Sequence, residues 1–340
     1  MAYGLLVVTQ VMDERDPVLG FFVHWVRGLA AEGELLHVVC WQADPALSIP
    51  GVTIQVLPKG ALWRTLALMY LSWKQRKAMR GVFVHMIPPV VVALGWWWRL
   101  LGWRVVLWYT HGTVSWSLRL AEWFTHVILT ASEESCRLRT KKKRVVGHGI
   151  DLDFFRVDPL VLREEIVLTV GRVTPRKDLA TIIDICAMVR ARLPECSFRL
   201  LVVGEPRTPD DYLYAQSMQA HARASGVADM IEWVGVRTGN ELRTLYQRAS
   251  VFLSASQTGS LDKVVLEALA CGTPVVAMGR VYADVAGVSC AENKERAVEM
   301  VLESLRHPAS TQAGRAWVEE NADIKGLLAN IRSAIALSSV

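Results

Sequence analysis

The amino-acid sequence predicts an α/β protein of two domains, each built on a doubly wound parallel sheet. Short apolar runs alternate with helical stretches along the whole chain, which is the pattern of parallel strands joined by crossover helices. The 340 residues suit two domains of ordinary size, each able to bury its own core. Residues 147–159 place glycines and aspartates between the two periodic regions. We therefore expect domains of residues 1–150 and 151–315, with the hinge between them in this segment.

In the first domain, strands are expected where β-branched and other apolar residues run together. These expected strands are residues 3–9, 36–41, 53–57, 82–86, 105–108 and 127–129. The expected helices between them are residues 20–31, 62–79, 90–101 and 115–124. Ser132 before Glu133 and Glu134 predicts one more helix start, because a serine oxygen caps the first amides of a helix.

The second domain repeats the alternation. Its expected strands are residues 166–170, 198–203, 230–234, 251–254 and 274–278. Its expected helices are residues 179–192, 211–225, 240–248, 264–270 and 295–306, followed by a last helical stretch from about Gly314.

The charge is unevenly distributed between the two halves. Residues 1–150 carry 17 Lys and Arg against 9 Asp and Glu, whereas residues 151–340 carry 21 against 24. Many of the 13 tryptophans lie in residues 63–108 among these basic residues. Two interpretations remain open, namely contact with an anionic membrane surface and a solvated basic face over a tryptophan-rich core. Nucleic acid is not an expected partner, because no binding motif accompanies the charge.

The cysteines and the apolar segments indicate the compartment. The six cysteines contain no Cys-x-x-Cys pair, which argues against a disulfide framework or a zinc site and for a reducing compartment. Residues 1–10 lack a basic start and are expected to form the first strand rather than a signal peptide. The apolar residues 82–98 are interrupted by His85, Pro88 and Pro89, so a membrane span is not expected there. We expect a cytoplasmic protein, with the cytoplasmic face of a membrane as a peripheral location.

A first motif joins a strand to a helix beside two cations. The apolar residues 166–170 are broken by Gly171, Arg172 and Lys177 lie beside the turn, and a helical pattern starts at Asp178. Unpaired amides at the start of such a helix favour an anion, and two cations would strengthen its binding.

A second motif surrounds Glu267. The helix of residues 264–270 is stopped by Gly272 and Pro274, and an apolar strand follows. Glu267 lies early on this helix, where the positive end of the helix dipole favours a carboxylate.

Both stretches resemble the nucleotide-sugar-binding domain of retaining glycosyltransferases of the GT-B fold, specifically glycosyltransferase family 4, also described as glycosyl transferases group 1. Residues 149–155, with the sequence Gly-Ile-Asp-Leu-Asp-Phe-Phe, and residues 235–253 extend the resemblance. It implies two Rossmann-like domains that face an interdomain cleft, with residues 316–340 forming a helix that crosses back to the first domain. It also implies a metal-independent enzyme without a cofactor, whose substrates are a nucleotide-sugar donor and a lipid-linked or surface glycan acceptor.

The resemblance also implies roles for individual residues. Arg172 and Lys177 would grip the donor diphosphate and stabilise the charge that develops on the leaving group. Glu267 would bind the ribose hydroxyls, since a carboxylate can accept two hydrogen bonds. The full donor-binding set would be Gly171, Arg172, Lys177, Gly204, Gly259, Ser260, Leu261, Asp262, Val264 and Glu267.

The sequence departs from the family pattern at one turn. Gly259 stands where the family has the first glutamate of its Glu-x7-Glu motif, and residues 260–262 stand where it has Gly-Phe-Gly. Asp262 has two interpretations, a displaced carboxylate for the sugar or a helix N-cap.

Two features of the first domain resemble the acceptor side of such enzymes. His111 follows an apolar strand, where the family places a catalytic histidine; the alternative is a turn histidine bound to the backbone. The loop from Asp16 to Gly20 resembles the flexible loop between the donor and acceptor sites.

Other activities are less well supported by the motifs. The chain has no Walker A sequence, no Gly-x-Gly-x-x-Gly after the first strand and no Gly-x-Ser-x-Gly. The remaining alternatives are a GT-B nucleotide-sugar epimerase and, because of Gly259, a catalytically silent nucleotide-sugar-binding homologue. The sequence does not specify the donor base, the sugar, the acceptor, the linkage or the oligomeric state.

Overall fold

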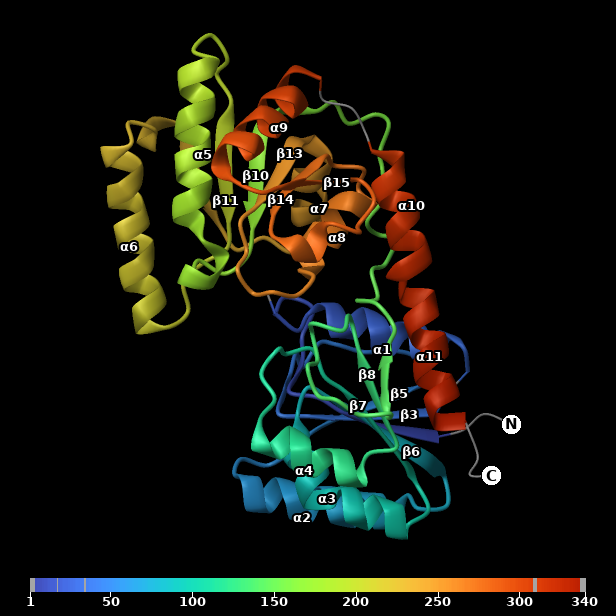
Figure 1. The fold of residues 1–340 in the computed structure, drawn as a ribbon. Helices are drawn as coiled ribbons and strands as arrows, with labels where there is room; N and C mark the ends of the chain where they lie inside the picture. Colours follow the sequence, from blue (N-terminus) through green and yellow to red (C-terminus); the bar gives the residue numbers. More distant parts are fainter. Residues whose placement is uncertain (1–3, 17, 34, 308–310, 337–340) are drawn as a thin grey trace. The chain divides into compact units, whose positions relative to one another are not determined.

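The structure is a computed structural model that describes residues 4–16, 18–33, 35–307 and 311–336. The chain divides into two compact units, which are Met1–Gly149 together with Ala322–Val340, and Ile150–Asn321 (Figure 1). The second division falls after Asn321, so residues 316–321 lie in the second unit and not in the segment that was expected to cross back from residue 316. Each unit is an α/β fold with a parallel sheet, which confirms the expected fold class.

The first unit is built on a sheet with the strand order β5-β3-β1-β6-β7-β8-β9, in which all neighbouring strands pair in parallel. These strands are β1 (Gly4–Val8), β3 (Leu35–Cys40), β5 (Val52–Val56), β6 (Met79–His85), β7 (Arg104–Trp108), β8 (Val127–Thr130) and β9 (Lys143–Val145). The short strands β2 (Val11–Met12) and β4 (Gln42–Ala43) pair with each other at the side. Tyr3, the expected start of the first strand, lies outside the described residues.

Helices cover both faces of this sheet (Figure 1). One face is covered by α2 (Ala61–Lys74), α3 (Pro88–Leu100) and α4 (Trp116–Phe124). The other face is covered by α1 (Phe21–Ala31) and by α11 (Ile324–Ala336), whose residues Ile324, Leu327 and Ile331 are buried in the same core cluster as Trp25.

The second unit has a sheet with the strand order β12-β11-β10-β13-β14-β15, again with parallel neighbours. These strands are β10 (Glu164–Val170), β11 (Arg199–Val203), β12 (Ile231–Gly235), β13 (Ala249–Ser254), β14 (Val275–Met278) and β15 (Val288–Ala291). Helices α5 (Leu179–Arg192), α6 (Pro209–Ala224) and α9 (Lys294–Arg306) share one core cluster with the sheet. Helices α7 (Gly239–Arg248), α8 (Lys263–Ala270) and α10 (Gln312–Asn321) contact one another in the same unit.

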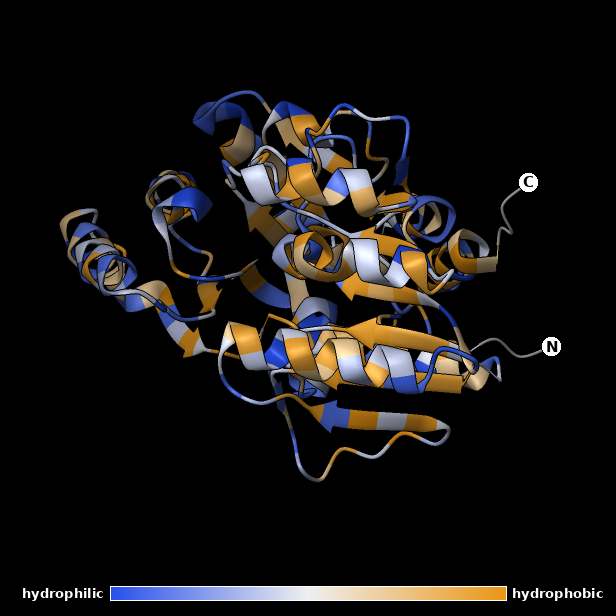
Figure 2. Cartoon of the chain, turned by 90° about the horizontal axis from the view of Figure 1, so that it is seen from below, coloured by the Kyte–Doolittle hydropathy of each residue, from blue (hydrophilic) through white to orange (hydrophobic). Residues whose placement is uncertain are grey.

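The strands of both sheets are almost entirely apolar, and Figure 2 shows most of them in the hydrophobic colour. β1 and β13 are buried at every position, because helices cover both faces of a parallel sheet. This explains why apolar runs predicted most strands, whereas β9, with its sequence Lys-Arg-Val at the sheet edge, was missed.

The expected helix start at Ser132 is wrong. The Ser132 hydroxyl accepts a hydrogen bond from the amide of Ser135 at 3.2 Å, but the segment forms only a turn. The chain has to return to the sheet edge as β9, and the ammonium of Lys143 bonds both the Glu133 carboxylate, at 2.5 Å, and the Cys136 carbonyl, at 3.1 Å. The expected single helical stretch from Gly314 is likewise two helices, α10 and α11, separated at residues 322–323.

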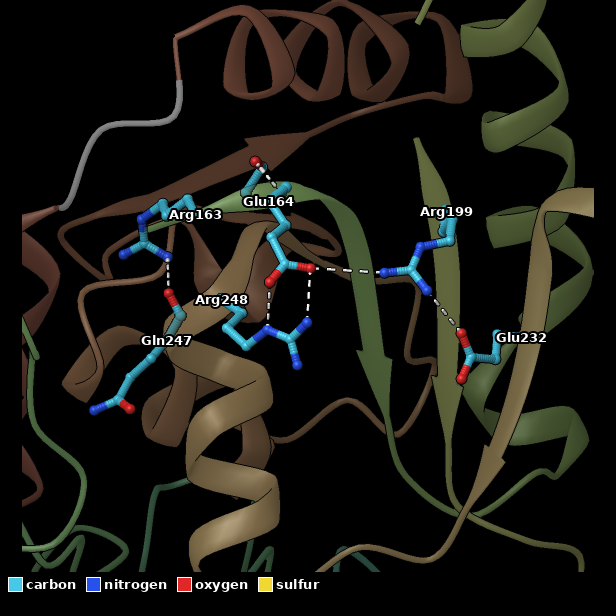
Figure 3. Close-up of polar contacts among 7 residues, drawn as sticks. Arg163, Glu164, Arg199, Glu232, Gln247 and Arg248 are labelled. Carbon is cyan, nitrogen blue, oxygen red and sulfur yellow. Dashed lines mark hydrogen bonds and ion pairs between the residues drawn. The ribbon is translucent and has the colours of Figure 1, made fainter. Parts of the chain in front are cut away.

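A polar network joins the amino ends of four elements of the second unit (Figure 3). The carboxylate of Glu164, the first residue of β10, accepts two hydrogen bonds from Arg248 at 2.5 and 2.8 Å and lies 3.6 Å from Arg199. Arg199, the first residue of β11, also donates to Glu232 of β12 at 3.1 Å. The neighbouring Arg163 donates to the carbonyl of Ala249, where β13 begins, at 2.7 Å. These contacts fix β10 between its neighbours at the end of the sheet opposite to the strand carboxyl ends.

We predict that Glu164→Gln lowers the stability of the second unit at neutral pH but not in acid. The Arg248 hydrogen bonds, against a smaller effect of burial, hold the pKa of Glu164 below its usual value of 4.5. A carboxylate with a lowered pKa stabilises the fold above its unfolded pKa, and this contribution is lost as the pH falls through the folded value. Because the pair is partly exposed, the expected loss at neutral pH is only about 0.5–1 kcal/mol.

Thermal unfolding of both proteins at neutral pH and at about pH 3 measures this effect. Glu299→Gln, which removes an exposed ion pair to Arg296 on α9, serves as the control. A difference between wild type and Glu164→Gln that persists unchanged in acid would contradict the charge-based account.

Candidate functional site

The second unit contains a pocket at the carboxyl end of its sheet, where β10 and β13 lie side by side. From β10 the chain builds β11 and β12 on one side, and then returns to build β13, β14 and β15 on the other. The connections after β10 and β13 therefore diverge, which is the topological switch point where open α/β sheets bind ligands. The pocket is lined by the ends of β10, β11 and β13, including Thr169, Val203, Ser254 and Ala255, and by the loop residues Gly171, Arg172 and Lys177.

Two glycines allow the loops after β10 and β11 to come together. Gly171 has φ 148° and Gly204 has φ 132°, and the amide of Gly171 donates to the carbonyl of Val203 at 2.9 Å. A Cβ atom at Gly204 would lie 2.0 Å from the carbonyl oxygen of Gly171. Only glycine at position 204 permits this approach, so the floor of the pocket depends on it.

Arg172 reaches out from the pocket toward the start of α6. Its side chain is 49% exposed, and its Nε lies 3.9 Å from a carboxylate oxygen of the buried Asp211. Burial raises the pKa of Asp211, but hydrogen bonds from Thr174 and Thr208 outweigh this effect and lower it. Asp211 is therefore a carboxylate, and it attracts the guanidinium of Arg172 at long range. Most N–H donors of this guanidinium remain open to a ligand.

Lys177 forms an ion pair with Asp262, with 2.8 Å between Nζ and Oδ2. It belongs to a short 3₁₀ helix, Pro175–Lys177, and its side chain is 27% exposed against 12% for Asp262. Asp262 occupies the N-cap position of α8, but its side chain makes no capping hydrogen bond. The N-cap interpretation of Asp262 is thus correct for its position before α8. It is wrong for the capping hydrogen bond, because the carboxylate pairs with Lys177 instead.

The start of α5 does not offer the free amides that the sequence suggested. The amide of Leu179 donates to the hydroxyl of Tyr214 at 3.0 Å, and the amide of Thr181 donates to the side chain of Asp178 at 3.4 Å. Asp178 is left-handed, with φ 47°, and its carboxylate also accepts from the side-chain amide of Gln257 at 2.7 Å. The cationic side chains, rather than these amides, are the groups available to an anion here.

Glu267 is buried on α8 within a small polar cluster. Its carboxylate accepts a hydrogen bond from the hydroxyl of Tyr246 at 3.0 Å and lies 3.7 Å from the ammonium of Lys263. Burial raises the pKa of Glu267, although Lys263 and Tyr246 oppose the shift. Burial also lowers the pKa of Lys263 to about 8, against the attraction of Glu267. Each partner therefore favours the ionised form of the other, against the effect of burial.

The remaining donor-side residues lie on the segment that leads into α8. Gly259 has φ 66°, the carbonyl of Ser260 lies 3.4 Å from the hydroxyl of Thr258, and Leu261 precedes Asp262. Val264 is half-buried in the first turn of α8.

The acceptor-side candidates lie in the first unit. His111 is exposed after β7, and its Nδ1 accepts a hydrogen bond from the amide of Thr113 at 3.2 Å, as in the turn-histidine interpretation. The loop before α1 is a tight turn in which Asp16 accepts from the amides of Val18 and Leu19, and the amide of Gly20 donates back to the Asp16 carbonyl at 2.9 Å. Pro17 lies outside the described residues.

The structure thus brings Gly171, Arg172 and Lys177 together in one pocket, with Gly204 and Asp262 in direct contact with them. Residues that the sequence analysis missed are the pocket-lining Ser254 and the partners Asp211, Tyr246 and Lys263. Lys263 could have been found, because it precedes Glu267 by four residues on a helix. The described residues contain no group of three or more His, Cys, Asp or Glu side chains placed to hold a metal ion.

Residues 164–306 match the family model described as glycosyl transferases group 1, and this match includes the whole pocket and α8. This region is therefore similar to the glycosyl transferases group 1 family. The expected resemblance is therefore confirmed for the second unit.

Solved structures match the chain over nearly its full length. The Anabaena protein HepE, solved in complex with UDP, has a TM-score of 0.75 at 14% identity and covers 98% of this chain and 99% of its own. A sucrose-phosphate synthase from Thermosynechococcus elongatus has a TM-score of 0.72 at 16% identity, covering 97% and 98%. At these identities the likeness shows the fold, and the fold is GT-B.

Curated relatives match over a shorter stretch. A D-inositol 3-phosphate glycosyltransferase of Segniliparus rotundus is 34% identical over 149 residues, which is 40% of this chain and 32% of the relative. The enzyme of the same name from Actinosynnema mirum is 37% identical over 115 residues, which is 32% of this chain and 26% of the relative. The matched stretch thus spans about a third or less of these relatives.

We predict that Gly204→Ala destabilises the second unit far more than Gly279→Ala. Both glycines have comparable φ values, 132° and 118°, but a Cβ at Gly279 would meet nothing within 4 Å. Both variants pay a conformational cost of about 1 kcal/mol, whereas Gly204→Ala adds the overlap with Gly171. We expect its free energy of unfolding to fall by roughly 2 kcal/mol more than that of the control in denaturant titrations. Equal losses would show that the two loops can separate freely.

Proposed function

We propose that the protein transfers a sugar from a nucleotide-diphosphate donor to a lipid-linked or surface glycan acceptor, with retention of configuration and without a metal ion. The observation that carries this proposal is the pair Arg172 and Lys177 in a pocket at the switch point of a glycosyl transferases group 1 domain. The matching HepE protein, which was also solved in complex with UDP-glucose, supports a nucleotide-sugar donor.

The two cations suit the chemistry of the leaving group. When the bond between the sugar C1 and the diphosphate oxygen breaks, the electron pair leaves with the diphosphate, whose negative charge grows. The guanidinium of Arg172 can form two parallel hydrogen bonds to phosphate oxygens, and Lys177 supplies a compact charge. Fixed donors of this kind stabilise the transition state more than the ground state, and this difference accelerates the reaction.

Glu267 suits the ribose of the donor. Its Oε2 is held by Tyr246 and its Oε1 lies nearest to Lys263, so the carboxyl group is oriented while keeping lone pairs for ribose hydroxyls. The acceptor side would use His111 and the Asp16–Gly20 loop, and we propose that the acceptor is presented at an anionic membrane surface. A cytoplasmic location also stays a prediction. No helix among the described residues has the length and apolar character needed to cross a membrane.

The silent homologue remains the second candidate because of Gly259, which leaves the loop before α8 without the family's first glutamate. Turnover of the donor distinguishes the enzyme from the silent homologue. Thermal-shift screening with UDP-, GDP- and ADP-sugars identifies the donor, because bound ligand raises stability. Donor hydrolysis or transfer with that donor then supports the enzyme, and saturable binding without product supports the silent module. Conversion of the donor to its sugar epimer would instead indicate the epimerase.

We predict that Arg172→Ala and Lys177→Ala each reduce transfer by roughly 100- to 1000-fold, because each removes a positive charge that would stabilise the leaving diphosphate. Nucleoside diphosphate binding, measured by calorimetry, should weaken by roughly tenfold or more. Arg176→Ala is a matched control, because Arg176 lies in the same loop but is exposed and outside the pocket lining. Unchanged affinity in Arg172→Ala, or an equal loss in Arg176→Ala, would remove the assignment.

We predict that Glu267→Gln weakens the binding of nucleoside diphosphate and nucleotide sugar by a similar factor, roughly tenfold, because both carry the ribose. Thermal unfolding is measured in parallel, since the substitution also removes the ion pair between Glu267 and Lys263. Glu241→Gln on α7, whose side chain is 73% exposed, is the control. A loss confined to the nucleotide sugar would place Glu267 at the sugar instead.

A further inference from the structure

The outer face of the first unit exposes large apolar side chains in helical stripes. On α2 the stripe is Trp63, Leu66, Tyr70 and Trp73, which are 64, 46, 65 and 51% exposed. Their spacing of three and four residues places them on one side of the helix. The opposite side of α2 is the one that buries Leu68 and Leu71 against the sheet.

The two neighbouring helices continue this face. On α4, Trp116, Leu120 and Trp123 are 82, 42 and 72% exposed, and on α3 Trp96 and Leu100 are 43 and 73% exposed. α3 contacts both α2 and α4, so the three helices form one layer (Figure 1). In Figure 2 the helices carry hydrophobic and hydrophilic segments side by side. α3 is apolar around almost its whole circumference, which is typical of a helix that is covered on all sides.

The charge of this layer has one sign. Residues 45–121 contain nine Lys and Arg and no Asp or Glu, and they include α2, α3 and most of α4. Lys74, Arg76, Lys77, Arg99 and Arg119 are exposed. Among the residues that the structure describes, none of these five cations forms an ion pair, and the guanidinium of Arg76 lies over the ring of Trp73 at 4.5 Å.

We propose that this layer, which we define as the outer faces of α2, α3 and α4, is a docking surface for an anionic lipid bilayer. Trp and Tyr side chains favour the boundary between headgroups and acyl chains, while Lys and Arg are drawn to anionic headgroups. Exposed tryptophans alone would also fit a protein partner or a second copy of the chain. An identical copy, however, would place two surfaces of the same positive charge against each other.

The proposal deepens the proposed function, because it assigns the surface at which a lipid-linked acceptor would be met, but vesicle binding is measured without any sugar transfer. The two can therefore fail separately. If calorimetry without lipid detects no donor binding, the proposed function alone is contradicted. If the chain does not bind vesicles, the docking surface alone is contradicted.

The first experiment measures partition of the full chain into vesicles of phosphatidylcholine with and without phosphatidylglycerol, by sedimentation. Trp116→Ser/Trp123→Ser should reduce binding to the anionic vesicles by roughly tenfold or more, because apolar burial drives interfacial binding. Leu160→Ser/Leu162→Ser is the matched control in the second unit, where these side chains are 89 and 83% exposed. Circular dichroism and thermal unfolding establish that each variant is folded.

The second experiment removes charge. Replacing Lys74, Arg76, Lys77 and Arg99 together by Gln should weaken binding to anionic vesicles on the order of 100-fold, and added salt should do the same. Replacing Arg192, Arg223, Arg280 and Arg306 of the second unit by Gln should leave binding unchanged. Equal binding to neutral and anionic vesicles, binding to neither, or salt-independent self-association that the Trp116→Ser/Trp123→Ser variant abolishes would overturn the proposal.

Discussion

The second unit depends on a constraint of parallel sheets. A chain that places strands on both sides of its first strand must once reverse the direction in which it adds strands to the sheet. Here the reversal lies between β10 and β13. The loops that follow these strands diverge and leave a space at the carboxyl end, and the side chains that line it come from the residues just past each strand. The Glu164 network fixes the opposite end of β10, so the position of Gly171 and Lys177 is determined at a distance from the pocket.

Much of this arrangement is visible in the sequence, and the reason is physical. The buried strands are nearly continuous apolar runs, and Gly171 interrupts one of them directly before Arg172 and Lys177. These signals are local. The ion pair between Lys177 and Asp262 is not local, because its partners are far apart in the sequence and only the strand order brings them together. The contact of Tyr214 with Leu179 is not local either. The hydroxyl of Tyr214 accepts the hydrogen bond of the Leu179 amide, so this amide is not available to the anion that a local pattern suggested.

Other errors arise where two local signals compete. Ser132 can cap a helix, yet the chain forms only a turn there, and Lys143–Val145 then pair with β8 as β9. The three adjacent tryptophans of α3 show the limit of composition: Trp96 is exposed, Trp97 is intermediate and Trp98 is buried, because a helix turns by 100° per residue. Composition indicated either a membrane surface or a tryptophan-rich core, and the structure contains both exposed and buried tryptophans.

The position of α11 has a consequence for synthesis on the ribosome. Its residues Ile324, Leu327 and Ile331 complete the core of the first unit, and Leu328 lies so close to Gly28 of α1 that a Cβ there would be 2.3 Å away. The strands of the first unit are translated first, but one face of their sheet is covered only in part, by α1, until after the second unit has emerged. The nascent chain can therefore finish its second unit before its first, which reverses the usual order of domain folding during translation. Throughout that interval the apolar side of α1 and the adjoining strands is a surface on which a chaperone can act.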